Sequence, residues 1–203
     1  MFDLRQIVAN NNSTFYDYAS GARKSVWPRI VALGAIALSV GLLLPSQSDD
    51  FLNAVLTVQS ILVGFSFSVL FFVLENSEVA APDDDSIERQ LKRERLSKLG
   101  KELFYNVSYY NTSAISSVIL ALFLMTAGPD QTTWKLVAEF IGRDLSVDGP
   151  VAEVATAVSK TAVLVATIGL YFFLIESLYT FYRTVLRVSF YFERKLELNQ
   201  VEE

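Results

Sequence analysis

Residues 51–74 read FLNAVLTVQSILVGFSFSVLFFVL, a stretch of 24 residues without a charged side chain. A bilayer core about 30 Å thick is crossed by about 20 mostly apolar helical residues, so this stretch is long enough to span a membrane. Three further uncharged apolar runs lie at residues 31–44, 105–127 and 161–175. The pattern predicts an all-α integral membrane protein in which four helices cross the bilayer.

The charged segments that separate these runs set the expected helix boundaries. We expect the transmembrane helices at about 27–44, 51–74, 105–127 and 158–181, because Trp27 fits an interfacial anchor and Pro28 fits a first helical turn. The predicted segments outside these helices are an interfacial N-terminal segment (1–26), a cytoplasmic helix running into the third span (85–104), an outer loop with a short amphipathic helix near residues 134–141 (128–157) and a cytoplasmic helical tail (182–203).

Lysine and arginine are distributed unevenly along the chain. Of the 17 basic residues, 14 lie in the N-terminal part up to Arg29, between the second and third spans, or after the fourth span. The other three are Lys135, Arg143 and Lys160, between the third and fourth spans. Basic loops stay on the cytoplasmic side. Both termini are therefore expected in the cytoplasm of a multi-pass protein of the bacterial inner membrane.

Composition excludes several classes of chemistry. The chain has neither cysteine nor histidine, which removes thiolate nucleophiles, imidazole bases and ordinary zinc sites. No phosphate-binding Gly-x-x-x-x-Gly-Lys loop is present. The formal charge of −5 argues against direct DNA binding. We expect a protein that is not an enzyme and needs no metal or cofactor.

Polar residues inside the spans are the candidates for a conduction path, because they are costly in hydrocarbon. Glu176 and Glu75 fall near the inner edge of the bilayer core, and Asn106, Tyr109 and Ser113 line the polar start of the third span. In an oligomer the two glutamates could form acidic rings at a pore mouth. The alternative is structural: Glu75 is hydrated, Glu176 pairs with Arg183 or a tyrosine hydroxyl, and the polar face of the third span holds helices together.

Small residues at a spacing of four mark possible helix-packing faces. Ser60 with Gly64 in the second span, and Ala37 with Gly41 in the first, let helix backbones approach closely. Such faces serve folding more often than assembly.

A basic run in the predicted cytoplasmic helix is the candidate partner-binding surface. It consists of Arg89, Lys92, Arg93 and Arg95. These side chains could bind an acidic partner, a nucleotide or lipid head groups. The alternative is a solvated helix whose charges only set the topology.

Three short patterns carry a resemblance to a known group of proteins. They are Ser13-Thr14-Phe15-x-Asp17-Tyr18-x-Ser20-Gly21, Leu56-x-x-Gln59-Ser60-Ile61-Leu62-x-Gly64-Phe65-x-Phe67 and Glu102-Leu103-x-x-Asn106-Val107-Ser108-Tyr109. With its four-helix layout, the chain resembles small bacterial membrane effectors of anti-phage defence systems, such as that of the Hailong system, and more distantly the membrane subunit of Kiwa. The resemblance implies a homo-oligomeric channel that depolarises the infected cell, controlled by a cytoplasmic protein or a nucleotide.

The leading prediction is a gated ion channel or pore-forming effector, assembled as a homo-oligomer in membrane lipid. One copy of four helices leaves little room for an aqueous path, so conduction requires several copies around an axis. The alternative is a non-conducting membrane scaffold that recruits a cytoplasmic enzyme or sensor through its long inner helices.

Overall fold

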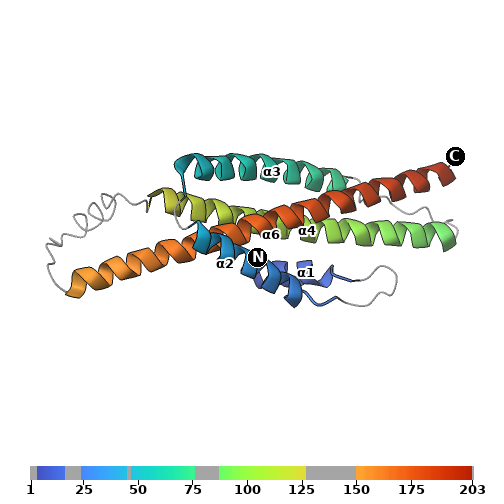
Figure 1. Cartoon of the computed structure of the whole chain (residues 1–203). Coiled ribbons are helices and arrows are strands. Elements are labelled where there is room, and N and C mark those ends of the chain that lie inside the picture. Colours follow the sequence, from blue (N-terminus) through green and yellow to red (C-terminus); the bar gives the residue numbers. More distant parts are fainter. Residues whose placement is uncertain (1–3, 17–23, 45–46, 76–86, 127–149, 203) are drawn as a thin grey trace. The chain divides into compact units, whose positions relative to one another are not determined.

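The computed structural model describes residues 4–16, 24–44, 47–75, 87–126 and 150–202 (Figure 1). The regular elements in these ranges are helices, and no β-strand occurs among the described residues. They are α1 (Leu4–Ser13), α2 (Trp27–Leu43), α3 (Asp49–Glu75), α4 (Ile87–Thr126) and α6 (Pro150–Glu202). The prediction of an all-α fold is confirmed for the described part of the chain.

Three of these helices contain stretches long and apolar enough to cross a membrane. The stretches are Asp49–Phe72 in α3, Glu94–Thr126 in α4 and Lys160–Glu193 in α6. Large apolar side chains on them are exposed; Phe71 and Ile61 of α3, for example, have exposed fractions of 67% and 65%. Such faces would promote aggregation in water but suit contact with lipid tails. These helices are compatible with a membrane protein.

The first predicted span, 27–44, corresponds to α2, which is shorter than the other three. Trp27–Leu43 has 17 residues, a length of about 26 Å at 1.5 Å per residue. That length lies just below the thickness of a typical hydrocarbon core. The described residues therefore include three helices long enough to span a bilayer and one apolar helix, α2, that is slightly shorter than a bilayer core is thick.

Helix ends follow local sequence signals. The Ser48 hydroxyl accepts a hydrogen bond from the backbone N–H of Phe51 at 3.2 Å, which caps the start of α3. Residues 87–126 form one continuous helix, as predicted for the segment that runs into the third span. The predicted outer loop 128–157 is wrong at its end, because α6 already begins at Pro150, where a proline suits the first helical position. The amphipathic helix predicted near 134–141 lies outside the described residues.

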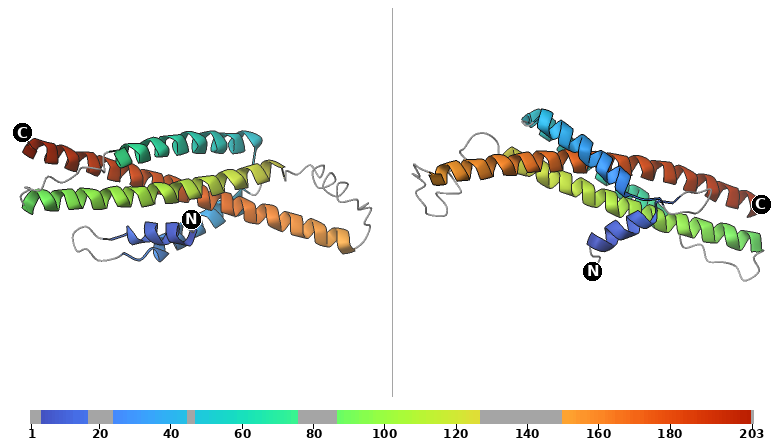
Figure 2. Two further views of the ribbon diagram at one scale, coloured as in Figure 1. Left: turned by 180° about the vertical axis from the view of Figure 1, so that it is seen from behind. Right: turned by 60° about the horizontal axis from the view of Figure 1, so that its bottom comes forward.

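The chain divides into two compact units. The first comprises residues 1–30, 60–113 and 176–203. Within it, the end of α3, the start of α4 and the end of α6 lie side by side (Figure 2). Leu103 of α4 and Tyr191 of α6 are buried together, and the ring of Phe72 of α3 packs against that of Phe192 of α6 with ring centroids 4.9 Å apart.

The second unit comprises residues 31–59 and 114–175. Its apolar core joins Leu52 and Val55 of α3, Ala121 of α4, and Leu170 of α6. The Tyr171 hydroxyl of α6 donates a hydrogen bond of 2.8 Å to Oε1 of Gln47, which lies just before α3.

Candidate functional site

Buried polar side chains line the facing sides of α4 and α6 in the first unit. On α4 they recur at spacings of four, three and four residues, and on α6 at four, four and three, so each set lies on one helix face. We call them the polar seam: Glu102, Asn106, Tyr109 and Ser113 of α4, with Glu176, Thr180, Thr184 and Arg187 of α6. Tyr109 is half-buried and the others are buried.

One end of the seam holds a buried ion pair. Arg29, at the start of α2, donates from Nη2 to Glu176 Oε1 at 2.5 Å, and the Glu176 side chain is only 1% exposed. The Tyr109 hydroxyl hydrogen-bonds to the same carboxylate, and Ser113 hydrogen-bonds to Tyr109. Hydrogen bonds from several donors offset the cost of removing a carboxylate from water. The Glu176 carboxylate is thus held by Arg29 and Tyr109.

A second buried ion pair lies on the Glu102 side of the seam. Arg187 Nη1 is 3.3 Å from Glu102 Oε2, and both side chains are at least nine-tenths buried. The Tyr16 hydroxyl donates to the other oxygen of Glu102 at 2.8 Å. The ammonium group of Lys98 lies 5.3 Å from the centre of the Tyr16 ring, within the range of a cation–π contact.

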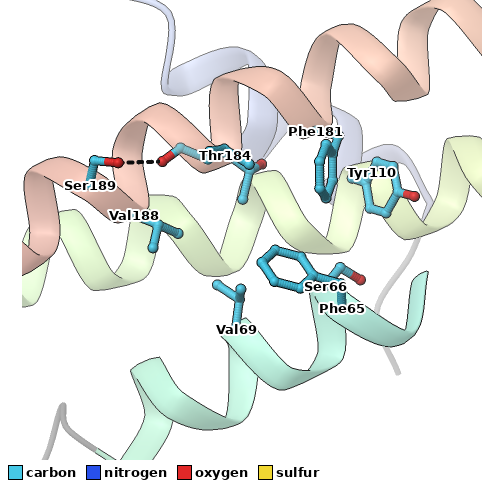
Figure 3. A pocket seen from close by; sticks show the side chains of 9 residues that line it. Phe65, Ser66, Val69, Tyr110, Phe181, Thr184, Val188 and Ser189 are labelled. Atoms are coloured by element: carbon cyan, nitrogen blue, oxygen red, sulfur yellow. Dashed lines mark hydrogen bonds between the residues drawn. The ribbon is translucent and has the colours of Figure 1, made fainter. Parts of the chain in front are cut away.

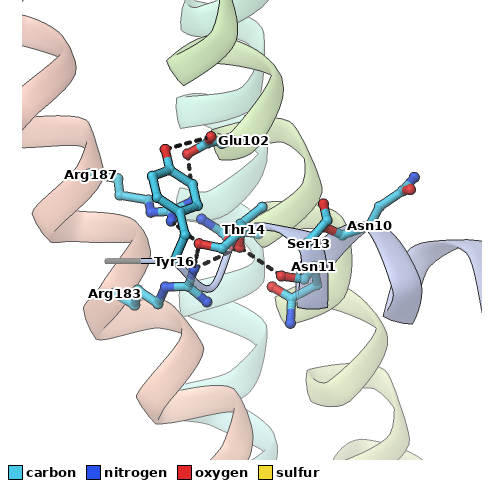
Figure 4. A network of polar contacts seen from close by, with 9 residues as sticks. Asn10, Asn11, Ser13, Thr14, Tyr16, Glu102, Arg183 and Arg187 are labelled. Atoms are coloured by element: carbon cyan, nitrogen blue, oxygen red, sulfur yellow. Dashed lines mark hydrogen bonds and ion pairs between the residues drawn. The ribbon is translucent and has the colours of Figure 1, made fainter. Parts of the chain in front are cut away.

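Thr14 connects the N-terminal segment to both helices of the seam (Figure 4). Its carbonyl oxygen accepts a hydrogen bond of 2.7 Å from Arg183 Nη2 and another of 2.7 Å from Arg187 Nη2. Its hydroxyl accepts from Arg183 at 2.6 Å and lies 3.2 Å from Asn106 Oδ1. Hydrogen bonds from guanidinium groups are stronger than those between neutral groups. Thr14 is therefore held by two cations at once.

Phe15 lies between two guanidinium groups. The Arg183 Cζ atom is 3.5 Å from the centre of the Phe15 ring, and the Arg29 Cζ atom is 4.5 Å from it. In this part of the described chain, Arg29 pairs with Glu176 and Arg187 pairs with Glu102. The third arginine, Arg183, lies against the Thr14 carbonyl and the Phe15 ring, whose negative partial charges stabilise its positive charge. The site combines ionic, polar and aromatic contacts.

A groove lined mainly by apolar side chains lies among α3, α4 and α6 in the same unit, and Thr184 of the polar seam is one of its lining residues (Figure 3). Phe65 and Val69 of α3, Tyr110 of α4 and Phe181 and Val188 of α6 line it. Phe181 contacts both aromatic neighbours, with ring centroids 5.8 Å from Phe65 and 5.5 Å from Tyr110. Among the described residues no group of acidic side chains is arranged to hold a metal ion.

The other residues predicted from sequence occupy different places. Glu75 is the last residue of α3, and Arg89, Lys92 and Arg93 lie in the helical backbone of α4; the side chains of these four are outside the described part of the structure. Arg95 is exposed. The structure therefore places Glu176, Asn106, Tyr109 and Ser113 in one polar seam.

The two small-residue faces differ. Ala37 is fully buried, and a Cβ atom placed on Gly41 would lie 2.7 Å from Ile168 Cγ1, so Gly41 allows α2 and α6 to approach closely. A Cβ atom placed on Gly64 would meet nothing within 4 Å, and Ser60 is exposed. Only the first face packs against another helix in the described structure.

Sequence reasoning missed the partners that complete the site. The sequence patterns give no reason to place Arg29, Thr14, Glu102 and Arg187 in one buried cluster. One signal was available: on a helix, Glu176, Thr180, Arg183, Thr184 and Arg187 follow one face at spacings of three and four. A polar face continuing past the predicted end of the fourth span indicates that the tail packs against another element.

Comparison of the chain with protein-family models, with curated proteins and with solved structures finds no match. Over its described residues the chain is a helical protein, and three of the helices described are apolar and of membrane-spanning length.

Proposed function

We propose that the chain is a multi-pass protein of the bacterial inner membrane and that a homo-oligomer of it conducts ions. The observation that carries this proposal is the polar seam: the Glu102–Arg187 ion pair, Glu176, a tyrosine, an asparagine and several hydroxyls lie along the stretches of α4 and α6 that are long and apolar enough to span a membrane. Polar and ionisable groups at membrane depth are expensive and commonly mark ion pathways. In this proposal α2 also crosses the bilayer, as the first of four spans, and both termini are cytoplasmic.

The ion pair gives the path a defined resting state. While Arg29 neutralises Glu176, the carboxylate offers no free negative charge to a cation. Separating the pair would expose an acidic group at one end of the seam, where it would attract cations. We assign the opening of the channel to this separation, and activity in anti-phage defence to the resulting loss of membrane potential.

Oligomer formation is part of the same proposal. The exposed face around Ser60 and Gly64 on α3 offers a surface where a second copy could approach closely, because Gly64 leaves open space beside the helix. Membrane lipid covers the remaining apolar surface.

Ion flux through purified protein in liposomes, with the particle mass measured in the same detergent, tests the proposal. Glu176→Gln keeps the shape of the side chain but removes its charge, and should change flux at least tenfold while the particle mass stays the same. Glu193→Gln is the matched control, because Glu193 is an exposed acid on the same helix. Equal flux for both variants, or a monomeric particle, contradicts the assignment.

The length of α4 and α6 favours a second candidate, a scaffold. At 1.5 Å per residue, 40 residues of α4 extend about 60 Å and 53 residues of α6 about 80 Å, well beyond a bilayer core. In this reading a cytoplasmic protein or a nucleotide binds the basic run on α4. Charge reversal at Arg89, Lys92, Arg93 and Arg95 should then abolish capture of the partner and leave liposome flux unchanged.

A further inference from the structure

The segment before α2 is attached to the rest of its unit in an unusual way. Of the side chains in α1, only that of Asn11 is buried, while Leu4 and Val8 have exposed fractions of 63% and 42%. The segment therefore gains little from apolar burial. Its attachment depends instead on Thr14, Phe15 and Tyr16, which contact α4 and α6 through charged groups.

The docked position also carries a cost. Both polar atoms of the Asn11 side chain are buried without a hydrogen-bond partner in the described structure. A buried amide without hydrogen bonds loses its bonds to water and gains none in return, so it destabilises the docked position. Undocking would hydrate Asn11, and water could replace the Thr14 carbonyl at the two arginines. A segment held by exchangeable polar contacts, with few apolar ones, belongs to the part of a structure that opens most readily.

The docking position coincides with the polar seam. Thr14 lies against Asn106, Tyr16 against Glu102, and Phe15 against Arg29, the partner of Glu176. Release of the segment would thus uncover part of the seam and remove the aromatic ring beside Arg29. The same movement would weaken both buried ion pairs, since each includes a residue that contacts the segment.

We infer that residues 4–16 form an N-terminal latch, which holds the seam closed when docked and permits conduction when released. This inference rests on the proposed channel function and adds the element that controls it. The trigger acts on the latch, by changing how often Thr14 leaves Arg183 and Arg187.

A reversible cross-link tests the latch, and the absence of cysteine in the chain makes the experiment specific. Asn10 of α1 and Ser108 of α4 line one small pocket in the first unit, and neither side chain belongs to the contacts around Thr14. The double variant Asn10→Cys with Ser108→Cys is joined in liposomes by a short bis-methanethiosulfonate reagent, which dithiothreitol removes. Each single variant, treated in the same way, is the control.

The expected result is that the cross-linked protein loses flux at least tenfold and that reduction restores it, while the single variants are unaffected. Equal flux before and after reduction, with cross-linking complete, overturns the latch.

A second readout does not depend on conduction. Thr14→Val, introduced into the double-cysteine protein, removes the hydroxyl that accepts from Arg183, and should slow cross-linking by about tenfold because a hydrogen bond to a charged group is lost. Ser13→Ala is the matched control, since Ser13 is exposed and its hydroxyl bonds to the Asn10 carbonyl within α1. Equal rates for the two variants overturn the latch. If Thr14→Val cross-links more slowly than Ser13→Ala but no state of the protein conducts ions, the segment does dock through Thr14. That outcome overturns both the proposed channel and its control by the latch.

Discussion

Arg29 at the start of α2 and Glu176 in α6 form a buried ion pair, with 2.5 Å between Nη2 and Oε1. The pair joins positions 147 residues apart, and the Arg29 guanidinium also contacts the rings of Phe15 and Tyr179 at 4.5 and 5.0 Å. Arg29, at the start of α2, therefore contacts both the N-terminal segment and α6 through its guanidinium group.

Removing one member of this pair should destabilise the protein more than removing both. Glu176→Gln leaves Arg29 buried without a counter-ion, and Arg29→Met leaves Glu176 in the same condition; we expect each to lower the free energy of unfolding by about 3–5 kcal/mol. The double variant should lose less than either single variant, because no unpaired charge stays buried. Denaturant unfolding in detergent, analysed as a double-mutant cycle, measures the coupling. Additive losses would mean that the two charges do not interact.

Substitutions at Glu102 and at its partner Tyr16 should lower the free energy of unfolding by different amounts. Tyr16→Phe removes one hydrogen bond to the carboxylate, so we expect a loss of about 1.5–3 kcal/mol, the range for hydrogen bonds to charged groups. Glu102→Gln also leaves Arg187 buried without its ionic partner and should cost more. The two variants are compared by unfolding in the same detergent. A larger effect for Tyr16→Phe than for Glu102→Gln would contradict this reading of the cluster.

The sequence predicts helices in this chain much better than it predicts which residues meet. Uncharged runs such as 51–74 specify a helix by length and hydropathy, and Ser48 and Pro150 mark helix starts locally. The contacts of Thr14 with Arg183 and Arg187 join residues about 170 positions apart, and no periodicity relates them. A single backbone carbonyl carries no sequence signal at all. The face shared by Glu176, Thr180 and Arg187 was readable, but its partner on the N-terminal segment was not.

The ring of Phe15 should matter through its π-electrons as well as its size. Phe15→Leu keeps an apolar side chain but removes the ring between Arg29 and Arg183, and we expect a loss of about 1–2 kcal/mol from two cation–π contacts that are partly desolvated. Phe15→Trp should retain the contacts if the larger ring fits. Thermal unfolding of both variants in detergent distinguishes the two effects. A Leu variant as stable as the original protein would show that the ring contributes by volume alone.

The two glycines at small-residue faces give a test that separates folding from assembly. A methyl group on Gly41 would come within 2.7 Å of Ile168 Cγ1, so Gly41→Ala should destabilise the fold by about 1–3 kcal/mol, the usual cost of overpacking, less the gain in helix propensity. Ile168→Ala shortens the opposing side chain, so the double variant should recover part of the loss.

Gly64→Ala is the comparison, because the added methyl group meets nothing within 4 Å inside the chain. It should leave the free energy of unfolding of the monomer unchanged or raise it by up to about 1 kcal/mol, since alanine is the better helix former. Gly64→Leu places a larger side chain on the same open face. If a second copy packs there, this variant should reduce the particle mass in detergent while the helical circular dichroism signal stays the same. An unchanged particle mass would remove the Gly64 face of α3 from the oligomer interface.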